Sequence, residues 1–231
     1  MDIVKITVTD FAQNCRILCD RQARAAVVID PGGEVSRIFS ALSELEFDSL
    51  AIWLTHAHID HAGGVVALRR LLAEKGVIDV PLYAHTAEKQ LRMMLKFQAE
   101  MFGMSGSDWD NCPEPDVCID EGSTVAVGRY QARVFFTPGH SPGHVSFYFA
   151  GNSTANGEGS SPMLFSGDVL FAGSAGRTDL PGGDYSTLID TLRRVILPLP
   201  DNTIVFSGHG PETTIGEERK RNPFMLEAER S

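Results

Sequence analysis

The sequence predicts a single-domain α/β protein, and three observations support that prediction. The chain has 231 residues, more than a typical domain of ~100 to 200 residues, but α/β and sandwich folds often reach this length as one unit. Short apolar runs typical of strands alternate with amphipathic patterns typical of helices. The composition, with 43% hydrophobic and 22% charged residues, excludes disordered, collagen-like and coiled-coil classes. A chain of this size buries roughly 70 to 75% of the surface it exposes when unfolded, so residues 1–231 are expected to form one domain without disulfides or a structural metal.

The first half of the chain contains five predicted strands and three predicted helices. Apolar runs bounded by turn residues predict strands at residues 3–9, 15–19, 25–29, 50–54 and 80–84. Helical spacing of apolar residues predicts helices at residues 35–45, 65–75 and 86–101. The last of these helices carries Met94 and Met101 in an apolar pattern with Leu91 and Leu95. We expect the methionines to pack in a core rather than to bind a cofactor.

The second half is predicted to contain a run of strands, a helix and a final strand. Several strands with tight turns are predicted within residues 116–150, and the polar segment 152–162 (NSTANGEGSSP) is expected to be an exposed hairpin tip. An apolar run predicts a strand at residues 163–166, and a helix follows at residues 185–196. A last strand at residues 203–206 ends just before the tetrapeptide Ser-Gly-His-Gly.

Charge and the N-terminal segment restrict the possible partners and the compartment. The chain has 20 basic and 30 acidic residues, a net charge of −10, which opposes attraction to nucleic-acid phosphates and to anionic lipid. The N-terminus lacks the basic stretch, apolar run and cleavage site of a signal peptide, and no apolar run approaches the ~20 residues of a membrane span. We therefore expect a cytoplasmic protein that binds neither nucleic acid nor membrane.

The four cysteines do not form a zinc-knuckle pattern. Cys15 and Cys19 lie four residues apart, Cys112 and Cys118 flank a Pro-rich turn, and neither pair has the two-residue gap of a zinc knuckle. We expect buried thiols in a reducing cytoplasm rather than disulfides.

A cluster of histidines, residues 55–61 (THAHIDH), directly follows a predicted apolar strand. His56 and His58, two residues apart, can project the same way from extended chain, while a turn into a helix would aim Asp60 and His61 at a second point nearby. Imidazole and carboxylate suit Zn²⁺ or another borderline divalent metal and leave a bound water free to be activated. A polar loop with chance histidines is the alternative, which three histidines and an aspartate after a buried strand disfavour.

Three later residues share this context, because each lies in a turn after an apolar strand. They are His140, Asp168 and His209. Polar residues at the ends of adjacent strands converge on one edge of a sheet. Together with the first cluster they supply five histidines and two aspartates, enough for two metals that share one carboxylate. His144 is then expected to be a hydrogen-bonded turn residue, since the other positions already provide the ligands.

The motifs THAHIDH, TPGHSPGH, SGDVLF, AGRTDLPGGD and SGHGP occur in this order and resemble those of the metallo-β-lactamase-fold hydrolases, in particular the short bacterial proteins of the glyoxalase II (hydroxyacylglutathione hydrolase) branch. The resemblance spans nearly the whole chain. It implies an α/β fold of the αββα four-layer sandwich type with a dinuclear metal site at one edge. By motif matching, the first metal would be held by His56, His58 and His140, the second by Asp60, His61 and His209, with Asp168 as the bridge. The metals implied are two divalent ions, foremost zinc, with iron or manganese compatible with the same ligands.

This ligand set predicts hydrolysis of a thioester. Two divalent cations that share a water lower its pKa to about 7, so a bridging hydroxide nucleophile exists at neutral pH. A thioester suits such a site because a metal-stabilised thiolate can leave without a dedicated general acid. Asp60 can also orient the water through a hydrogen bond, so Asp60 and Asp168 are the candidate catalytic residues. The expected substrate is a small-molecule thioester such as S-lactoylglutathione.

Departures from the glyoxalase II pattern concern substrate recognition. Its longer members bind glutathione partly through a C-terminal helical domain, for which the 22 residues after His209 are too few. They also carry a tyrosine shortly after the last ligand histidine, where this chain has Gly210-Pro211. Arg177 stands where a basic residue would contact the glutathione moiety, and is the candidate substrate-binding residue. The alternative for Arg177 is a loop clamp with a neighbouring aspartate.

Other functions stay open at the level of sequence. A persulfide dioxygenase would hold one iron through His56, His140 and Asp168, and a lactonase would use the same ligands as the thioesterase. Class B β-lactamases commonly place cysteine where this chain has Asp168, which disfavours that activity. A noncatalytic metal-binding or partner-binding module is the interpretation from a different class, although a structural zinc site is normally closed by four protein ligands.

Overall fold

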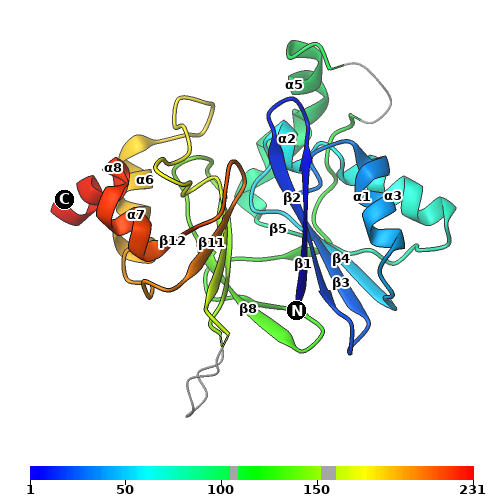
Figure 1. Cartoon of the computed structure of the whole chain (residues 1–231). Helices are drawn as coiled ribbons and strands as arrows, with labels where there is room; N and C mark the ends of the chain where they lie inside the picture. The colour runs from blue at the N-terminus through cyan, green and yellow to red at the C-terminus, as the bar shows by residue number, and fades with distance from the viewer. Residues whose placement is uncertain (105–108, 152–159) are drawn as a thin grey trace. The chain divides into compact units, whose positions relative to one another are not determined.

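The computed structural model describes residues 1–104, 109–151 and 160–231 (Figure 1). The chain forms two compact units: an N-terminal unit of Met1–Ile119 with Ala126–Gln131, and a C-terminal unit of Asp120–Val125 with Ala132–Ser231. Most of the segment predicted to be an exposed hairpin tip lies outside the described residues. The described residues form two six-stranded sheets, called here the N-terminal and the C-terminal sheet, and the prediction of one domain stays a prediction.

The N-terminal sheet has the strand order β1-β2-β3-β4-β5-β6. Its strands are β1 (Asp2–Val8), β2 (Gln13–Asp20), β3 (Ala25–Ile29), β4 (Ser49–Trp53), β5 (Leu82–Ala84) and β6 (Val117–Cys118). The first three pair antiparallel through short turns, whereas β3 to β6 run parallel. Because parallel strands require crossovers, helices connect the later strands of this sheet. The five strands predicted in the first half of the chain are confirmed.

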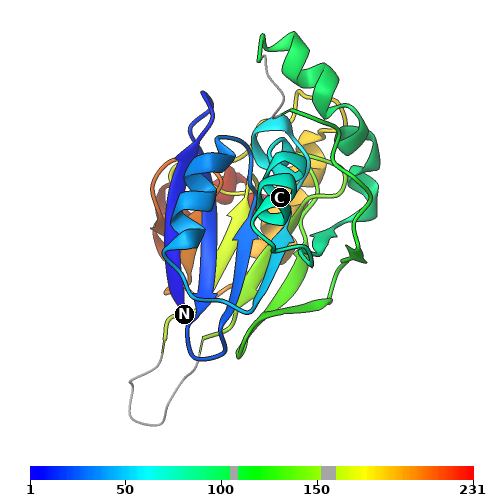
Figure 2. The same cartoon turned by 90° about the vertical axis from the view of Figure 1, so that its right-hand side faces the viewer.

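Two amphipathic helices cover one face of this sheet (Figure 2). Helix α1 (Val35–Ser43) buries Val35, Ile38 and Leu42, and α3 (Val65–Glu74) buries residues with the same spacing of three and four. This spacing gives each helix one apolar stripe that packs into the core of the unit. The short helix α2 (Ile59–Ala62) lies between them in sequence.

The predicted long helix 86–101 is broken into three pieces, which are η1 (Thr86–Glu88), α4 (Lys89–Met93) and α5 (Leu95–Met101). Met94 separates the last two with φ −106° and ψ 4°, outside the helical region. Leu91 and Leu95 are buried as predicted, but Met94 is 45% and Met101 67% exposed. The expectation that these methionines pack in the core is therefore wrong, because the core-facing stripe is narrow and consists of residues 91, 95 and 99.

The C-terminal sheet has the order β12-β11-β10-β9-β8-β7. Its strands are β7 (Thr124–Val127), β8 (Tyr130–Phe136), β9 (Val145–Phe149), β10 (Met163–Gly167), β11 (Ile204–Ser207) and β12 (Thr213–Thr214). Strand β9 is antiparallel to both β8 and β10, and β11 is parallel to β10. The carboxyl ends of β8, β10 and β11 consequently lie at the same edge of this sheet.

The helices of the C-terminal unit pack on its sheet through a core that contains Leu164, Val205 and Leu188 (Figure 1). They are α6 (Tyr185–Thr191), the single π-helical turn η2 (Leu192–Ile196), α7 (Ile215–Arg221) and α8 (Pro223–Arg230). The Asp184 carboxylate caps α6 by accepting from the backbone N–H of Thr187 at 2.7 Å. The predicted helix 185–196 is confirmed as α6 and η2 together.

The turn between β7 and β8 is anchored to the end of β2 by an ion pair. The buried carboxylate of Asp20 accepts from Nε and Nη2 of Arg129, both at 2.9 Å, and from the Arg129 backbone N–H at 2.9 Å. These hydrogen bonds hold the pKa of Asp20 well below its ordinary value. Gly128 adopts φ 56°, and a Cβ there would lie 2.6 Å from Oδ2 of Asp20, so glycine is required for this close approach.

The cysteines are unpaired by disulfides, and three of the four are buried. Burial raises the pKa of the Cys112 thiol to about 12. The expectation of buried thiols without disulfides is confirmed for Cys15, Cys19 and Cys112. It is wrong for Cys118, which is exposed in the two-residue edge strand β6.

Within the described part of the chain, no helix has the length and apolar character needed to span a bilayer.

Candidate metal centre

Four candidate ligands of the N-terminal unit follow the carboxyl end of β4. His56 and His58 lie in extended chain, His58 is the N-cap residue of α2, and Asp60 and His61 lie in that helix. Three pairs in this group have a ring nitrogen or carboxylate oxygen of each partner within 4.8 Å of the other. These pairs are His56 with His58, His56 with His61, and Asp60 with His61. The three histidines are buried and Asp60 is partly buried. The structure thus brings these four residues into one cluster, while their metal roles stay predictions.

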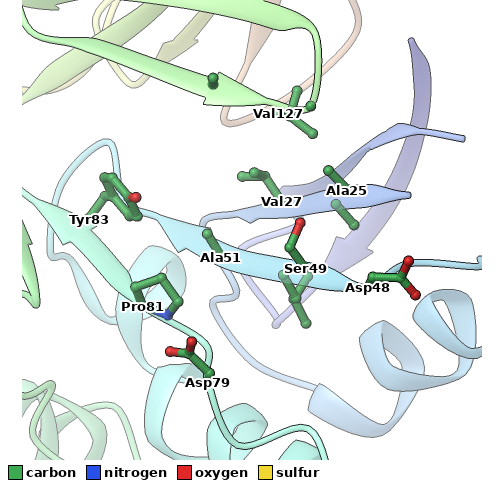
Figure 3. Close-up of a pocket in the computed structure, with 13 residues that line it drawn as sticks. Ala25, Val27, Asp48, Ser49, Ala51, Asp79, Pro81, Tyr83 and Val127 are labelled. Carbon is green, nitrogen blue, oxygen red and sulfur yellow. The ribbon is translucent and has the colours of Figure 1, made fainter. Parts of the chain in front are cut away.

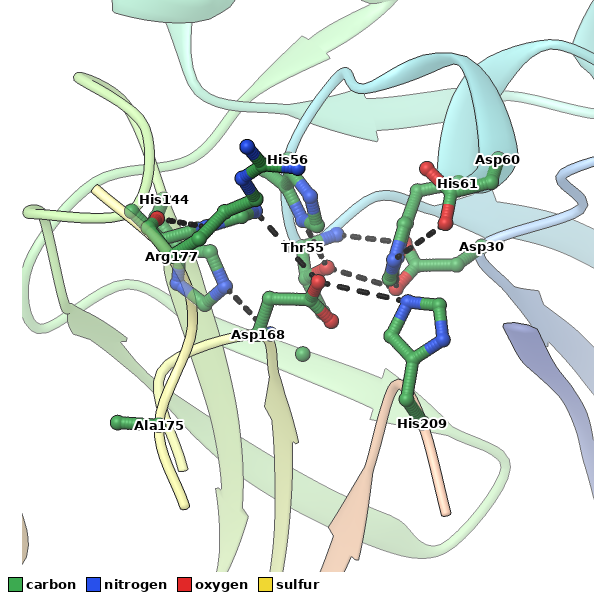
Figure 4. Close-up of polar contacts among 12 residues, drawn as sticks. Asp30, Thr55, His56, Asp60, His61, His144, Asp168, Ala175, Arg177 and His209 are labelled. Carbon is green, nitrogen blue, oxygen red and sulfur yellow. Dashed lines mark hydrogen bonds and ion pairs between the residues drawn. The ribbon is translucent and has the colours of Figure 1, made fainter. Parts of the chain in front are cut away.

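One buried carboxylate, Asp30, organises two of these histidines (Figure 4). Asp30 directly follows β3, and its side chain is only 3% exposed. Its Oδ1 accepts from the backbone N–H of Thr55 at 2.8 Å, and its Oδ2 accepts from the Thr55 hydroxyl at 2.6 Å. The same Oδ2 lies 3.0 Å from Nδ1 of His61, and the Thr55 hydroxyl lies 3.0 Å from Nδ1 of His56. Asp30 therefore connects, directly or through Thr55, to two candidate ligands.

In neutral imidazole rings, these contacts select which nitrogen carries the proton. The Asp30 carboxylate accepts from Nδ1 of His61, so the lone pair of the neutral ring is on Nε2. The Thr55 hydroxyl gives its single proton to Asp30, so it accepts from Nδ1 of His56. Nε2 of His56 then also keeps a lone pair. Neutral imidazole with a free ring-nitrogen lone pair is the form that binds a divalent metal.

Two further contacts fix the backbone of this cluster. A Cβ at Gly32 would lie 1.4 Å from the carbonyl oxygen of Asp60, so only glycine allows the loop after β3 to approach α2 this closely. The buried carboxylate of Glu88 accepts from the backbone N–H of Ala57, between the two histidines, at 2.8 Å.

The remaining histidine of the N-terminal unit, His85, caps η1, because its Nδ1 accepts from the backbone N–H of Ala87 at 3.2 Å.

Three candidate ligands of the C-terminal unit meet at the shared edge of its sheet. His140, Asp168 and His209 follow β8, β10 and β11 respectively. Oδ2 of Asp168 lies 3.5 Å from Nε2 of His140 and 3.5 Å from Nε2 of His209, and Figure 4 shows His209 directed at this carboxylate. Asp168 is therefore central to the group, which is the position that a bridging carboxylate requires.

Neighbouring backbone groups orient this second set. Nδ1 of His140 lies 2.7 Å from the carbonyl oxygen of Arg177, so Nδ1 donates to this oxygen. The backbone N–H of Asp168 donates to Nε2 of His144 at 3.0 Å, and Nδ1 of His144 lies 2.8 Å from the hydroxyl of Thr137. The expectation that His144 is a hydrogen-bonded turn residue is confirmed. A Cβ at Gly176 would lie 1.9 Å from the Asp168 carbonyl oxygen, so this turn also requires glycine.

The side chain of Arg177 forms the alternative contact considered from the sequence. Its Nε and Nη2 donate to the two carboxylate oxygens of Asp179 at 2.6 and 2.7 Å. These hydrogen bonds lower the pKa of Asp179 to about 2 and raise that of Arg177. Both side chains are more than 60% exposed. The structure thus shows a surface clamp, and a role of Arg177 in substrate binding stays a prediction.

The donor chemistry of both clusters fits divalent metals. Each cluster combines imidazole nitrogens with carboxylate oxygens. In His56, His61 and His140, Nδ1 donates a hydrogen bond to a neighbouring oxygen. Such sets suit zinc, iron and manganese. Sequence reasoning missed Asp30 and Glu88, which hold the first cluster in place. The sequence does contain a signal for Asp30, because it is an acidic residue between an apolar strand and a Pro-Gly-Gly turn.

A cavity of about 280 Å³ in the N-terminal unit is separate from these residues (Figure 3). It is lined by residues that include Ala25, Ser49, Ala51 and Tyr83. Ala25 and Ser49 are the first residues of β3 and β4, whereas the candidate ligands follow the last residue of β4. The cavity is therefore not part of the candidate metal centre.

Comparison with known proteins agrees with the resemblance seen in the motifs. Residues 8–209 match the profile of the metallo-β-lactamase superfamily. A Haemophilus influenzae protein named hydroxyacylglutathione hydrolase GloC is 37% identical, over 97% of this chain and 98% of its own length. The crystal structure of BLEG-1 B3 metallo-β-lactamase is similar with a TM-score of 0.80 and 38% identity, covering 97% of this chain and 99% of that one. TTHA1623 in a di-iron-bound form has a TM-score of 0.77 and 35% identity, over 96% and 99% of the two chains. The predicted α/β fold of the metallo-β-lactamase type is confirmed.

Proposed function

Because the chain belongs to the metallo-β-lactamase superfamily, we propose that it is a metal-dependent hydrolase that cleaves a small-molecule thioester such as S-lactoylglutathione. The relative named hydroxyacylglutathione hydrolase supports the thioester, since it matches almost the full length of both chains. The observation that carries the proposal is the orientation of the histidines. Nδ1 of His56 is hydrogen-bonded to Thr55 and Nδ1 of His61 to Asp30, so in the neutral rings Nε2 is the nitrogen that would bind metal.

The proposed cofactor is a pair of divalent ions, foremost zinc, with iron or manganese as alternatives that the same ligands accept. The di-iron form of a solved structure at 35% identity supports a dinuclear centre in that protein and motivates one here. We assign the first ion to His56, His58 and His140, the second to Asp60, His61 and His209, and the bridging position to Asp168. Motif order and the grouping of these residues within each unit support the assignment.

Divalent ions bound by these residues would supply a nucleophile at neutral pH, because they lower the pKa of a coordinated water. Asp60 would accept a hydrogen bond from the attacking water and orient it, since its carboxylate is partly buried beside His61, with Oδ2 3.8 Å from Nε2. The hydrogen bond from the Asp168 backbone to His144 would keep the bridging carboxylate in position.

Substrate recognition is assigned to Arg177. Its guanidinium is exposed and is held by Asp179, so an anionic group of the substrate would have to share or displace that carboxylate. We propose that a charged thioester gains affinity from Arg177, whereas a neutral thioester does not. The variant R177A should then lower kcat/KM more for the charged substrate, and equal losses on both would reduce Arg177 to a loop clamp.

The proposed place of action is the cytoplasm. Cysteines without disulfides are typical of a reducing compartment. The net charge of −10 disfavours nucleic acid and anionic membrane as partners.

Hydrolysis of β-lactams is the second candidate function. The observation in its favour is the 38% identity to the structure of a B3 metallo-β-lactamase over 97% of this chain. The glutathione thioester is preferred because the relative named hydroxyacylglutathione hydrolase matches 97% of this chain and 98% of its own length.

The test combines metal analysis with a substrate panel. Purified protein reconstituted with zinc, iron or manganese should hold two equivalents and hydrolyse S-lactoylglutathione faster than a β-lactam. D168A should lose nearly all turnover and remain folded, whereas the matched control D190A, an exposed aspartate of α6 paired with Arg193 and Arg194, should keep it. One equivalent of iron with oxygen-dependent persulfide consumption, or preferential β-lactam turnover, would overturn the proposal. Bound metal without any turnover would indicate a noncatalytic module.

A further inference from the structure

The N-terminal unit has an apolar surface that neither its core nor the candidate metal centre uses. Six of the nine large apolar side chains exposed by the described residues belong to it. These six, called the α5 patch below, are Phe11, Met93, Met94, Phe97, Met101 and Phe102. Their exposed fractions range from 40% for Phe11 to 67% for Met101.

The residues of the α5 patch are grouped on α5, on the residues that flank it and on one turn beside it. Phe97 and Met101 are four residues apart in α5, so they lie on the same helix face, opposite the buried Leu95 and Ala99. Phe102, at the end of α5, packs edge-to-face against Phe11 from the turn between β1 and β2, with ring centroids 5.3 Å apart. The two methionines that precede α5, Met93 and Met94, are exposed as well.

The size of the α5 patch is that of a protein interface. Phenylalanine and methionine side chains exposed by about half present ~100 Å² each, so the patch presents on the order of 600 Å² of apolar surface. This equals the largest patch of a typical monomer and approaches the ~800 Å² that each partner contributes to a standard interface. Small-molecule sites are concave, whereas these side chains stand on the outside of a helix.

The charges beside the α5 patch indicate which partner fits. Lys96 and Glu100 are both exposed and lie one turn apart on α5. If α5 packs antiparallel on a second α5 about a two-fold axis near Gln98, Lys96 of each copy faces the partner's Glu100. An anionic membrane would instead require a basic rim, and the net charge of −10 opposes it.

We propose that the α5 patch is a two-fold interface at which a second copy of this chain packs, α5 against α5. The interface buries the α5 patch of each copy and pairs Lys96 with the partner's Glu100 twice. This inference is independent of the proposed function, because it uses none of the candidate ligands.

Sedimentation equilibrium of the full chain over a range of concentrations tests the proposal. The wild-type protein should be a dimer, and F97E and M101E should be monomers, because each buries a carboxylate in the α5 patch. I78E is the matched control, since Ile78 is 83% exposed in the same unit but outside the patch, and it should remain dimeric. Thermal unfolding checks that each variant is folded. We expect all three to fold, because Phe97, Met101 and Ile78 are exposed.

A charge exchange tests the register. K96E and E100K should each raise the dimer dissociation constant by about three- to tenfold, and the double variant K96E/E100K should restore it, because opposite charges again face each other. A wild-type protein that is monomeric at every concentration overturns the proposal, whether or not it binds phosphatidylglycerol vesicles. A dimer that survives F97E and M101E, or a double variant no tighter than the single ones, overturns it as well.

Discussion

Replacing Asp30 by asparagine should weaken metal binding by about ten- to a hundredfold, although the change only replaces one carboxylate oxygen by an amide nitrogen. Three donors converge on this carboxylate: the backbone N–H and hydroxyl of Thr55, and Nδ1 of His61. A carboxylate accepts from all three, whereas an amide directs its NH2 group at a donor in either orientation. Asp30 has a left-handed backbone with φ 53°, which asparagine also tolerates. The effect of D30N therefore reports the lost hydrogen bonds and not backbone strain.

The magnitude follows from the hydrogen bonds that the amide removes. With the amide nitrogen in place of Oδ2, the Thr55 hydroxyl and His61 both lose a charge-assisted hydrogen bond, each contributing ~1.5 to 3 kcal/mol. Part of this is recovered if Nδ1 of His61 accepts from the amide, which moves its proton to Nε2, the nitrogen assigned to metal. We therefore expect a decrease of about 3 kcal/mol in the free energy of unfolding and an imidazole tautomer that opposes coordination.

Competition between the metal-free protein and a chromophoric zinc chelator measures the affinity, and nitrogen-15 spectra of the imidazoles report the tautomer of His61. The matched control is D48N, because Asp48 is an exposed aspartate of the same unit that pairs with Arg24. D48N should bind zinc as the wild type does. Wild-type zinc affinity in D30N, or an unchanged His61 tautomer, would refute the reasoning.

Three further results are expected. E88A should weaken zinc binding about tenfold, because it removes the acceptor from the backbone N–H of Ala57, and E88Q should recover most of the loss; equal affinity of E88A and wild type would contradict this. The pKa of Asp20 is held below its ordinary 3.8 by Arg129, so its stabilisation is complete above about pH 4 and is lost as the pH falls through the folded-state value. Denaturant unfolding of wild type and D20N should show that the difference between their free energies of unfolding is smaller at acidic than at neutral pH. A difference that is the same at both pH values would contradict this pH dependence. One thiol, that of Cys118, should react rapidly with Ellman's reagent in the native protein and four after denaturation, whereas no fast thiol would show that Cys118 is covered.

The periodic elements could be predicted because their signals are local. Helix α1 repeats its buried residues at intervals of three and four, and β3 is a run of five buried residues between turns. Both patterns report which side of an element faces a core, whatever that core contains. The break at Met94 has no such local signal, since no proline or glycine marks it, and the exposure of Met101 follows from that break.

The candidate ligands were visible for a related reason. His56, His58, Asp60 and His61 are adjacent in sequence, and each later ligand stands directly after an apolar strand, so composition and position together single them out. The residues that orient them are not adjacent. Asp30 lies 25 positions before Thr55, and Glu88 lies 31 positions after Ala57. A single acidic residue at such a distance looks like any surface carboxylate until the fold buries it.

The sequence by itself determined the fold class, the approximate element boundaries and the types of metal-binding side chain, because these depend on local periodicity and on chemistry fixed by residue type. Only the tertiary structure decided which ring nitrogen of His56 and His61 is hydrogen-bonded within the protein, since that depends on where Thr55 and the Asp30 carboxylate lie relative to the rings. It also decided that Arg177 pairs with Asp179 and that Met94 and Met101 face outward. These contacts depend on distances between side chains, which sequence spacing does not constrain. Hydrogen bonds form only over a narrow range of donor–acceptor distances, so small displacements of the backbone would break them.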